Sequence, residues 1–263
     1  VKSASERFPG AIETYSIEAL MPDGKALQSA TSHDLGQNFS KAYDITFVDT
    51  DQKVKHVYTT SWGMSWRMLG AVIMTHGDDR GLRIPPKLAP IEAVFVPIVR
   101  GDNTAPVEKA RELAKQMRGQ GYRVRVDDSD QTPGWKFAEW EMRGVPVRIE
   151  IGPRDLENSS VTLVRRDKEK GEEGAKVSVS FDALGSRLRE LLDEIHASLY
   201  AQAKAFLDSH TFAVTERDRF LTMCKERAGM IDIPWCGRPE CEAEVKAATG
   251  ATTRNTRALL AHR

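Results

Sequence analysis

The sequence predicts a multidomain protein that combines α+β and α/β architecture. Residues 7–60 read mainly as short strands joined by polar turns. Residues 93–166 read as strands that alternate with helices, and a long amphipathic helix follows over 182–210. A run of strands followed by alternating strands and helices is typical of separate domains of these two classes. A chain of 263 residues is long enough for one large domain or for two to three ordinary ones.

Composition and charge exclude several classes of protein. Charged residues make up 29% of the chain and hydrophobic residues 40%, which indicates a folded protein and not a disordered one. Lys plus Arg equals Asp plus Glu at 38 each, so any patch that binds nucleic acid must be local. No apolar run approaches the ~20 residues of a membrane span. Three cysteines and no signal segment at the N-terminus predict a cytoplasmic protein that needs no membrane.

The N-terminal part begins with a predicted β-hairpin. Two strand-like segments, 12–20 and 25–32, flank a Met-Pro-Asp-Gly turn at 21–24. Proline and aspartate start such a turn, and glycine takes the positive φ angle that it requires. The sequence therefore predicts two antiparallel strands at this point.

The second strand of this hairpin carries polar side chains among small ones. Strict alternation of side chains places Gln28 on one face of the strand and Thr31 and His33 on the other. A face of small residues around Gln28 leaves room for a flat ligand. Residues 33–38 are expected to form a loop.

Residues 59–86 carry the most informative helix of the chain. They predict a tight turn at Trp62-Gly63 and then a helix over 65–76 that is apolar on almost all sides. A helix of that kind is buried in a core. Arg67 lies in its first turns, and a buried guanidinium needs an anionic partner. Two interpretations remain open: Arg67 pairs with a core carboxylate, or it binds an anionic ligand at the floor of a site.

Residues 93–166 predict a compact α/β domain with a mainly parallel sheet. The apolar run at 94–99 is suited to a strand buried on both faces. A helix over 104–118 follows, and later a short aromatic helix over 135–142. The apolar stripe of the helix at 182–210 indicates core packing and not a partner motif.

Motifs along the whole chain resemble those of one enzyme family, in the same order. They include Thr-Ser-Trp-Gly at 60–63, Gly-Asp-Asp-Arg-Gly-Leu at 77–82 and Pro-Gly-Trp-Lys-Phe at 133–137. The other matching segments are 16–20, 23–28, 31–33, 35–39, 85–86, 144–146, 152–155 and 236–242. On these residues the chain resembles the prolyl-tRNA synthetases, which are class IIa aminoacyl-tRNA synthetases. It resembles their eukaryote- and archaea-like form, which has an extra C-terminal domain.

The resemblance implies three domains. They are the C-terminal part of a class II catalytic domain with an antiparallel sheet at 1–92, an α/β anticodon-binding domain at 93–180, and a linking helix with a C-terminal zinc-binding-like α/β domain at 181–263. The resemblance also implies proline--tRNA ligase activity, in which ATP and Mg²⁺ activate L-proline to prolyl-adenylate for transfer to tRNA(Pro). The family enzyme is expected to act as a homodimer.

Only one of the three class II signature motifs is found in this chain. Residues 63–67 and the helix after them look like motif 3. Motifs 1 and 2 are expected to lie before Val1, in a longer chain. Half of the active site would then be absent, and we expect these residues alone to be inactive in proline activation.

The resemblance assigns roles to residues of the catalytic part. Arg67 matches the motif 3 arginine that binds the γ-phosphate of ATP, and it is the expected catalytic residue because this chemistry depends on positioning and on cationic stabilisation of phosphate charge. The residues that match ATP-binding positions are Gln28, Thr31, Ser61, Gly63 and Arg67. The residues that match proline-binding positions are His33, Trp62 and Ser61.

The expected tRNA contacts lie in and after the aromatic helix at 135–142. An aromatic ring, a cation and a carboxylate can stack on, hold and hydrogen-bond an unpaired guanine. The candidate tRNA-binding residues are Lys136, Phe137, Glu139, Arg143, Arg154 and Arg165, with Arg166 and Lys168 as further candidates for phosphate contacts. The alternative for each single basic residue is a solvated surface charge.

Cys236 and Cys241 form an incomplete candidate zinc site. They are spaced as C-x4-C, whereas a closed structural zinc site needs four ligands. In the family a second cysteine pair follows the Gly-Ala-Thr-x-Arg segment, which stands here at 250–254. No cysteine follows it in this sequence, and 255–263 do not resemble the family's continuation. Either the chain has been cut short or the metal site is absent.

Two other functions remain open at the level of the sequence. One is a tRNA-binding or regulatory synthetase paralogue without catalysis, although intact Gln28, Thr31, His33 and Arg67 favour an enzyme. The other is a class IIa synthetase for threonine or histidine.

Overall fold

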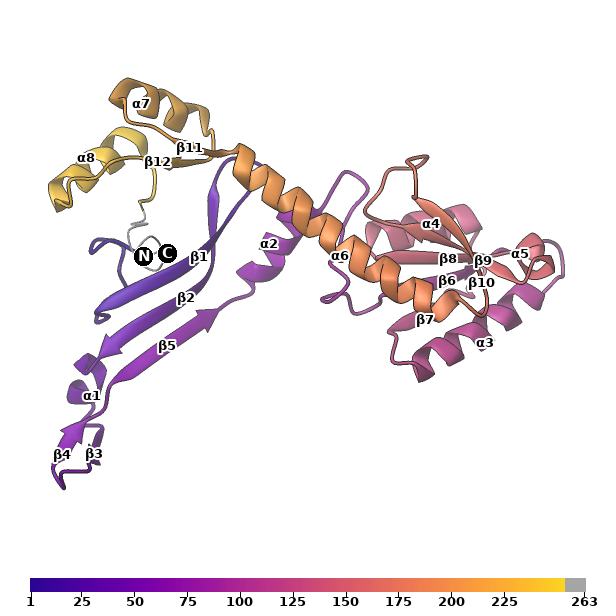
Figure 1. Cartoon of the computed structure of the whole chain (residues 1–263), viewed down its shortest axis with the longest axis horizontal. Coiled ribbons are helices and arrows are strands. Elements are labelled where there is room, and N and C mark those ends of the chain that lie inside the picture. Colours follow the sequence, from indigo (N-terminus) through magenta and orange to yellow (C-terminus); the bar gives the residue numbers. More distant parts are fainter. Residues whose placement is uncertain (254–263) are drawn as a thin grey trace. The chain divides into compact units, whose positions relative to one another are not determined.

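The structure of the chain is a computed structural model that describes residues 1–253, and it packs as two compact units (Figure 1). The first unit comprises Val1–Thr75 together with the segment from Leu207 onward, and the second comprises His76–Phe206. Among the described residues, no helix is both long enough and apolar enough to cross a membrane.

A three-stranded antiparallel sheet forms the centre of the first unit. Its strands stand in the order β1-β2-β5 (Figure 1). Their bounds are Glu13–Leu20 for β1, Ala26–Gly36 for β2 and Thr59–Met64 for β5. The predicted hairpin turn between β1 and β2 is confirmed: the Gly24 amide donates to the Met21 carbonyl, and Gly24 has a φ angle of 76°.

Pairing with β5 corrects two predictions about local structure. Residues 33–36 were expected to form a loop, but β2 continues through them because they pair with β5. A turn was expected at Trp62-Gly63, but both residues are extended and pair with Ser32 and Thr31. Tertiary hydrogen bonds thus override the local tendency of glycine to end a strand.

The remaining elements of the first unit are short. They are α1 (Asn38–Ala42), β3 (Thr46–Val48), β4 (Val54–His56), α2 (Arg67–His76), β11 (Thr211–Ala213), α7 (Arg217–Glu226), β12 (Met230–Asp232) and α8 (Pro239–Thr249). The buried carboxylate of Glu242 on α8 joins the two ends of the chain, since it accepts a hydrogen bond from Ser3 at 2.5 Å. Burial raises the pKa of Glu242, but hydrogen bonds from Ser3, Thr253 and Lys246 outweigh it and lower the pKa to about 2.

The prediction that the helix after β5 is buried is wrong for the described chain. Ala71 is the one buried residue of α2, whereas Leu69 and Ile73 are exposed. Trp66, which precedes the helix, is 85% exposed. An apolar sequence favours burial only where another element covers it, and the described residues supply no such element here.

A five-stranded mixed sheet forms the centre of the second unit (Figure 1). Its strands, in the order β10-β9-β8-β6-β7, are Lys176–Ser180, Ser160–Arg165, Val147–Ile151, Ala93–Pro97 and Val124–Val126. The strand β6 runs parallel to β7 and β8, whereas β9 runs antiparallel to β8 and β10. The prediction of a mainly parallel sheet therefore holds for half of the sheet.

Helices cover both faces of this sheet. They are α3 (Ala105–Gly119), α4 (Pro133–Met142), α5 (Pro153–Glu157) and α6 (Leu184–Ser209). The larger apolar cluster joins α3 and α6 to the sheet through side chains such as Leu113, Leu188 and Ile149, all at most 2% exposed. A smaller cluster on β6 contains Trp140 of α4. The two units confirm the predicted combination of α+β and α/β architecture, and α6 confirms the prediction of core packing.

We expect Gly144→Ala to destabilise the second unit by about 1–3 kcal/mol. Gly144 has a φ angle of 71°, and a Cβ there would lie 2.6 Å from the carbonyl carbon of Leu82. Urea unfolding followed by circular dichroism measures the effect. Gly119→Ala is the matched control, because Gly119 is helical and a Cβ there meets nothing within 4 Å. An equal loss in both variants would contradict the steric explanation.

Candidate functional site

A β-bulge in β2 brings three predicted site residues onto one face of the first sheet. Three cross-strand pairs show this: Thr14 with His33, Ser16 with Thr31, and Glu18 with Gln28. Positions 14, 16 and 18 alternate along β1 and therefore share a face, and directly opposed residues lie on the same face. The bulge at Ser29 adds one residue to β2, so Gln28 joins Thr31 and His33. Strict alternation had placed Gln28 on the opposite face, and that prediction is wrong.

The third strand adds two of its predicted residues to this face. Ser61 pairs with His33 and Gly63 pairs with Thr31, which places both beside the three residues of β2. Trp62 pairs with Ser32, so the register puts it on the opposite face, where it is 81% exposed. The expected contact between Trp62 and a ligand held by His33 is therefore not provided by the described residues.

Arg67 reaches the same strands from the first turn of α2. Its Nη1 donates to the backbone carbonyl of Gln28 at 3.4 Å, and its side chain is exposed. Within residues 1–253, no carboxylate lies at ion-pair distance from its guanidinium, so the interpretation as a core ion pair is wrong for this part of the chain. The Gln28 side-chain oxygen accepts from Lys2 Nζ at 2.6 Å. The face thus presents one unpaired arginine at one end and His33 at the other.

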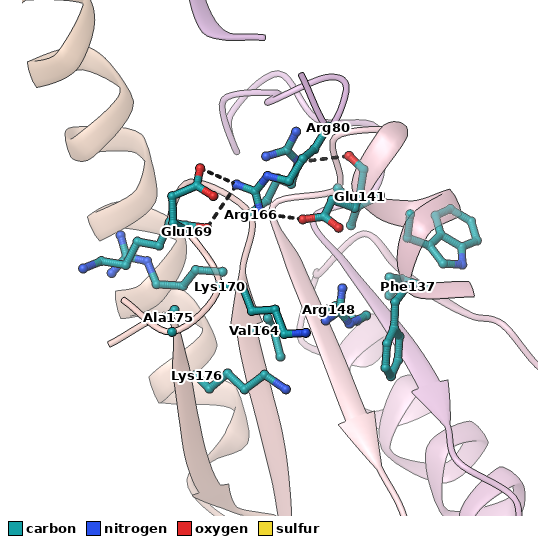
Figure 2. Close-up of a pocket in the computed structure, with 16 residues that line it drawn as sticks. Arg80, Phe137, Glu141, Arg148, Val164, Arg166, Glu169, Lys170, Ala175 and Lys176 are labelled. Atoms are coloured by element: carbon teal, nitrogen blue, oxygen red, sulfur yellow. Dashed lines mark hydrogen bonds and ion pairs between the residues drawn. The ribbon is translucent and has the colours of Figure 1, made fainter. Parts of the chain in front are cut away.

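A cavity of about 250 Å³ lies in the second unit, where α4, the sheet and the loop before β10 meet (Figure 2). Phe137 and Trp140 of α4 supply aromatic walls, and Val145 and Val164 add aliphatic ones. The cationic residues that line it are Arg80, Arg148, Arg165, Arg166, Lys168, Lys170 and Lys176. An aromatic cavity with several cations suits a planar ring attached to an anionic backbone.

Arg148 and Phe137 form the aromatic–cation pair of this cavity. The guanidinium carbon of Arg148 lies 4.1 Å from the centroid of the Phe137 ring. Glu150 holds the same guanidinium at 2.9 Å, which fixes its plane. Figure 2 shows both side chains beside the open space. A flat base can stack on such a pair, and the guanidinium can also donate hydrogen bonds to it.

Ion pairs hold the rim of the cavity. Arg80 donates to Glu141 at 2.6 Å and to Glu169 at 3.1 Å (Figure 2). Arg166, buried at 5% exposure, makes two hydrogen bonds to Asp78 at 2.5 and 2.8 Å. The hydrogen bond from Arg166 is the main cause that lowers the pKa of Asp78 to about 2. These arginines are therefore structural. Lys168 is likewise paired with Glu172 at 2.8 Å and Lys176 with Glu150 at 3.3 Å, whereas Lys170 has no ion pair within residues 1–253.

Two residues that were predicted to contact tRNA, Lys136 and Arg165, are bonded to other residues within the fold. Lys136 is 4% exposed, and its Nζ donates to the Asp127 carbonyl at 3.1 Å. The guanidinium of Arg165 lies at the cavity but is paired with Asp167 and Glu194, both at 2.8 Å. The structure does not bring either cation to open surface, because each satisfies a neighbouring carboxylate or carbonyl.

The other predicted tRNA contacts divide between cavity and surface. Phe137 lines the cavity, as described above. Glu139 accepts from Arg143 at 2.6 Å on the outer side of α4, and Arg154 is exposed on α5. None of these three charged residues lines the cavity.

Sequence reasoning missed Arg80, Glu141, Arg148, Lys170 and Lys176, which line the cavity. Arg148 had a signal, because it is the cation at the outward position between the apolar residues Val147 and Ile149 of β8. The loop lysines had none beyond their charge.

The cysteines do not complete a metal site in the described residues. No group of three or more His, Cys, Asp or Glu residues within 1–253 could hold a metal ion. Cys236 accepts a hydrogen bond from Arg238, which is the main cause that lowers its pKa to about 7. Two thiols alone do not fit the four-ligand zinc site, so we derive no role for zinc.

A family model matches part of the second unit. Residues 92–191 match the family model described as anticodon binding domain. The match covers the predicted domain at 93–180 and continues into α6, whose leucines belong to the same core. The division into 1–92, 93–180 and 181–263 stays a prediction.

Curated relatives match almost the whole chain. This chain is 50% identical to the proline--tRNA ligase of Rubrobacter xylanophilus over 256 residues, which is 97% of its length. It is 47% identical over 96% of its length to that of Lachnospira eligens and 46% identical over 97% to that of Symbiobacterium thermophilum. The resemblance to the prolyl-tRNA synthetases is confirmed. The chain spans about half the length of these relatives, at 52–53%.

We expect the stability that Asp78 gives to this prolyl-tRNA synthetase-like chain to be lost at low pH. The folded pKa of about 2 lies below the ordinary value of about 4, so the contribution of about 2 kcal/mol is present above pH 4 and disappears as the pH falls through 2. Urea unfolding at several pH values, for the parent and for Asp78→Asn, measures it. The difference in the free energy of unfolding between the parent and Asp78→Asn should become smaller toward pH 2. A difference that stays constant with pH would contradict the explanation.

Proposed function

We propose that the chain is part of a proline--tRNA ligase, in which it binds the anticodon and supplies one half of the site that activates L-proline. The observation that carries this proposal is the lining of the cavity in the second unit. Phe137, Arg148 and the loop lysines meet there, inside the segment that matches the anticodon-binding family model. The 50% identity to a proline--tRNA ligase extends over 97% of this chain and supports the catalytic half.

The activation step needs few acid or base groups. The carboxylate of L-proline attacks the α-phosphorus of ATP, the bond to the β-phosphate oxygen breaks, and pyrophosphate leaves. Arg67 holds the γ-phosphate, while Gln28 and Thr31 contact the adenosine side and His33 contacts proline. Ser61 and Gly63 lie between them on β5. Mg²⁺, which travels with ATP, neutralises the phosphate oxygens when it is bound.

The anticodon contact explains why the cavity combines an aromatic ring with cations. Proline codons begin with two cytosines, so the matching anticodons end in two guanines. A guanine can stack on Phe137 and accept hydrogen bonds from Arg148 at its O6 and N7 atoms. Lys168, Lys170 and Lys176 stand at the rim where the tRNA phosphates would pass.

The alternative function is that of a tRNA-binding or regulatory synthetase paralogue without catalysis. The match of residues 92–191 to the anticodon-binding family model would be sufficient for it. A homodimer, a cytoplasmic location and the use of ATP and Mg²⁺ belong to the first function. Measurements of tRNA binding and of proline activation separate the two.

We expect Phe137→Ala to weaken the binding of a proline tRNA transcript by about 5- to 100-fold, because stacking on an aromatic ring contributes about 1–3 kcal/mol per base. Fluorescence anisotropy with a labelled transcript measures it. Phe181→Ala is the matched control: Phe181 also lies under a cation, Lys109 at 4.9 Å, but it does not line the cavity.

Replacement of the two anticodon guanines should abolish the difference between Phe137→Ala and the parent. Equal weakening by Phe137→Ala and Phe181→Ala, or equal binding of the altered transcript by the parent chain, would contradict the anticodon assignment.

We expect the 263-residue chain alone to show no proline-dependent exchange of pyrophosphate into ATP, because only motif 3 of the three class II signature motifs is found in it. The full-length protein should show exchange, and Arg67→Ala should reduce it by about 100-fold or more. Exchange by the chain alone would refute the proposal that it supplies only one half of the activation site. A full-length protein without exchange would favour the non-catalytic paralogue.

A further inference from the structure

A buried threonine contacts the histidine that the proposed function assigns to proline. Thr14 of β1 is fully buried and lies directly across from His33 of β2. The Thr14 Oγ1 atom lies 3.0 Å from His33 Nδ1. The backbone amide of Phe8 donates to the same oxygen at 3.3 Å. The histidine is therefore held through one ring nitrogen by a group that solvent does not reach.

The groups around Thr14 Oγ1 decide the direction of this hydrogen bond. The oxygen already accepts from the Phe8 amide. If His33 Nδ1 also carried a proton and donated it, the buried hydroxyl hydrogen of Thr14 would have no acceptor among residues 1–253. If the Thr14 hydroxyl instead donates to an unprotonated His33 Nδ1, then the Phe8 amide, the Thr14 hydroxyl and Nδ1 all have a hydrogen-bond partner.

We propose that Thr14 is a positioning residue that keeps neutral His33 in the tautomer with its proton on Nε2. The Phe8 ring packs against the imidazole with centroids 4.9 Å apart and limits its rotation. His33 is partly exposed, and its Nε2 has no hydrogen-bond partner in the part of the chain that the structure describes. The assignment of His33 to proline rests on the proposed function, whereas the tautomer does not.

The tautomer selects which atom of the ligand His33 contacts. An Nε2–H group can only donate a hydrogen bond. L-Proline offers acceptors at its carboxylate oxygens, whereas its protonated ring nitrogen is a donor. His33 therefore faces the carboxylate, or the carbonyl oxygen that the carboxylate becomes in prolyl-adenylate, and not the ring nitrogen. The uncharged Nε2–H donor suits both L-proline and prolyl-adenylate, because the carboxylate of proline loses its negative charge when the adenylate forms.

The test is ¹⁵N NMR of the 263-residue chain labelled at the histidine ring nitrogens, with the His33 signals assigned by their loss in His33→Asn. In the parent, Nδ1 should resonate as an unprotonated nitrogen and Nε2 as a protonated one. Thr14→Val keeps the shape but removes the donor, and it should lower the tautomer ratio by about fivefold. Thr14→Ser restores the hydroxyl and should restore the ratio.

Ser40→Ala separates this effect from a general loss of stability. Ser40 is another fully buried hydroxyl of the first unit, where it donates to the Val57 carbonyl at 2.6 Å, away from His33. Its removal should leave the His33 signals unchanged. A parent chain with the proton on Nδ1 would overturn the proposal. The proposal would also be overturned if Thr14→Val kept the parent's tautomer ratio at His33. It would likewise be overturned if Ser40→Ala lowered that ratio.

Titration with L-proline distinguishes this inference from the proposed function, and it is made on the full-length protein and its variants because the 263-residue chain supplies only one half of the proposed activation site. Proline should move the Nε2 signal of the parent and of Thr14→Ser, with about fivefold weaker binding in Thr14→Val. If proline leaves the parent signals unmoved while the tautomer results hold, the assignment of His33 to proline fails and the role of Thr14 stands. If proline binds and the Thr14→Val tautomer is unchanged, Thr14 has no positioning role.

Discussion

The bulge at Ser29 is the constraint on which the first site depends. One additional residue in β2 shifts its alternation, so that Gln28 shares a face with Thr31 and His33. The same pairing places Ser61 and Gly63 of β5 on that face and sets Thr14 against His33. Without the bulge, the expected adenosine contact and the expected proline contact would lie on opposite sides of the sheet. The register thus decides which polar side chains can act on one ligand.

Ion pairs have a comparable role in the second unit. The sheet supplies the apolar floor of the cavity, but Arg166–Asp78 and Arg80–Glu141 hold the loop that borders it. Buried pairs of this kind add little net stability, and the loss of one partner is costly. Their effect here is geometric. They fix the rim beside Phe137 and Arg148, and Arg148 is itself paired with Glu150 at 2.9 Å.

The sequence was sufficient to predict the hairpin, several helices and strands, and the resemblance to the family. It was not sufficient to predict where several side chains lie. Periodicity predicted the hairpin, the strand β6 and the helix α6, since each has a continuous local pattern. It could not predict that β5 passes straight through Trp62-Gly63, because that depends on hydrogen bonds to β2. Lys136 and Arg165 were predicted as tRNA contacts. The fold buries Lys136 beside the carbonyl of Asp127, and it brings Glu194 of α6 to Arg165, which its neighbour Asp167 also pairs.

The two sites differ in how complete they are, and this has a consequence for how the function is divided. Every residue that lines the cavity belongs to the second unit, so base recognition requires nothing from the first. Among residues 1–253, Arg67 on the sheet face has no ionic partner and His33 Nε2 has no hydrogen-bond partner, and the apolar helix α2 beside them is largely exposed. Arg67 and His33 are accessible to water, whereas the exposed apolar side chains of α2 are the groups that contact with a partner would stabilise. In the proposed function, anticodon binding therefore needs only residues of the second unit, whereas β1, β2 and β5 of the first unit form one wall of the site for proline activation.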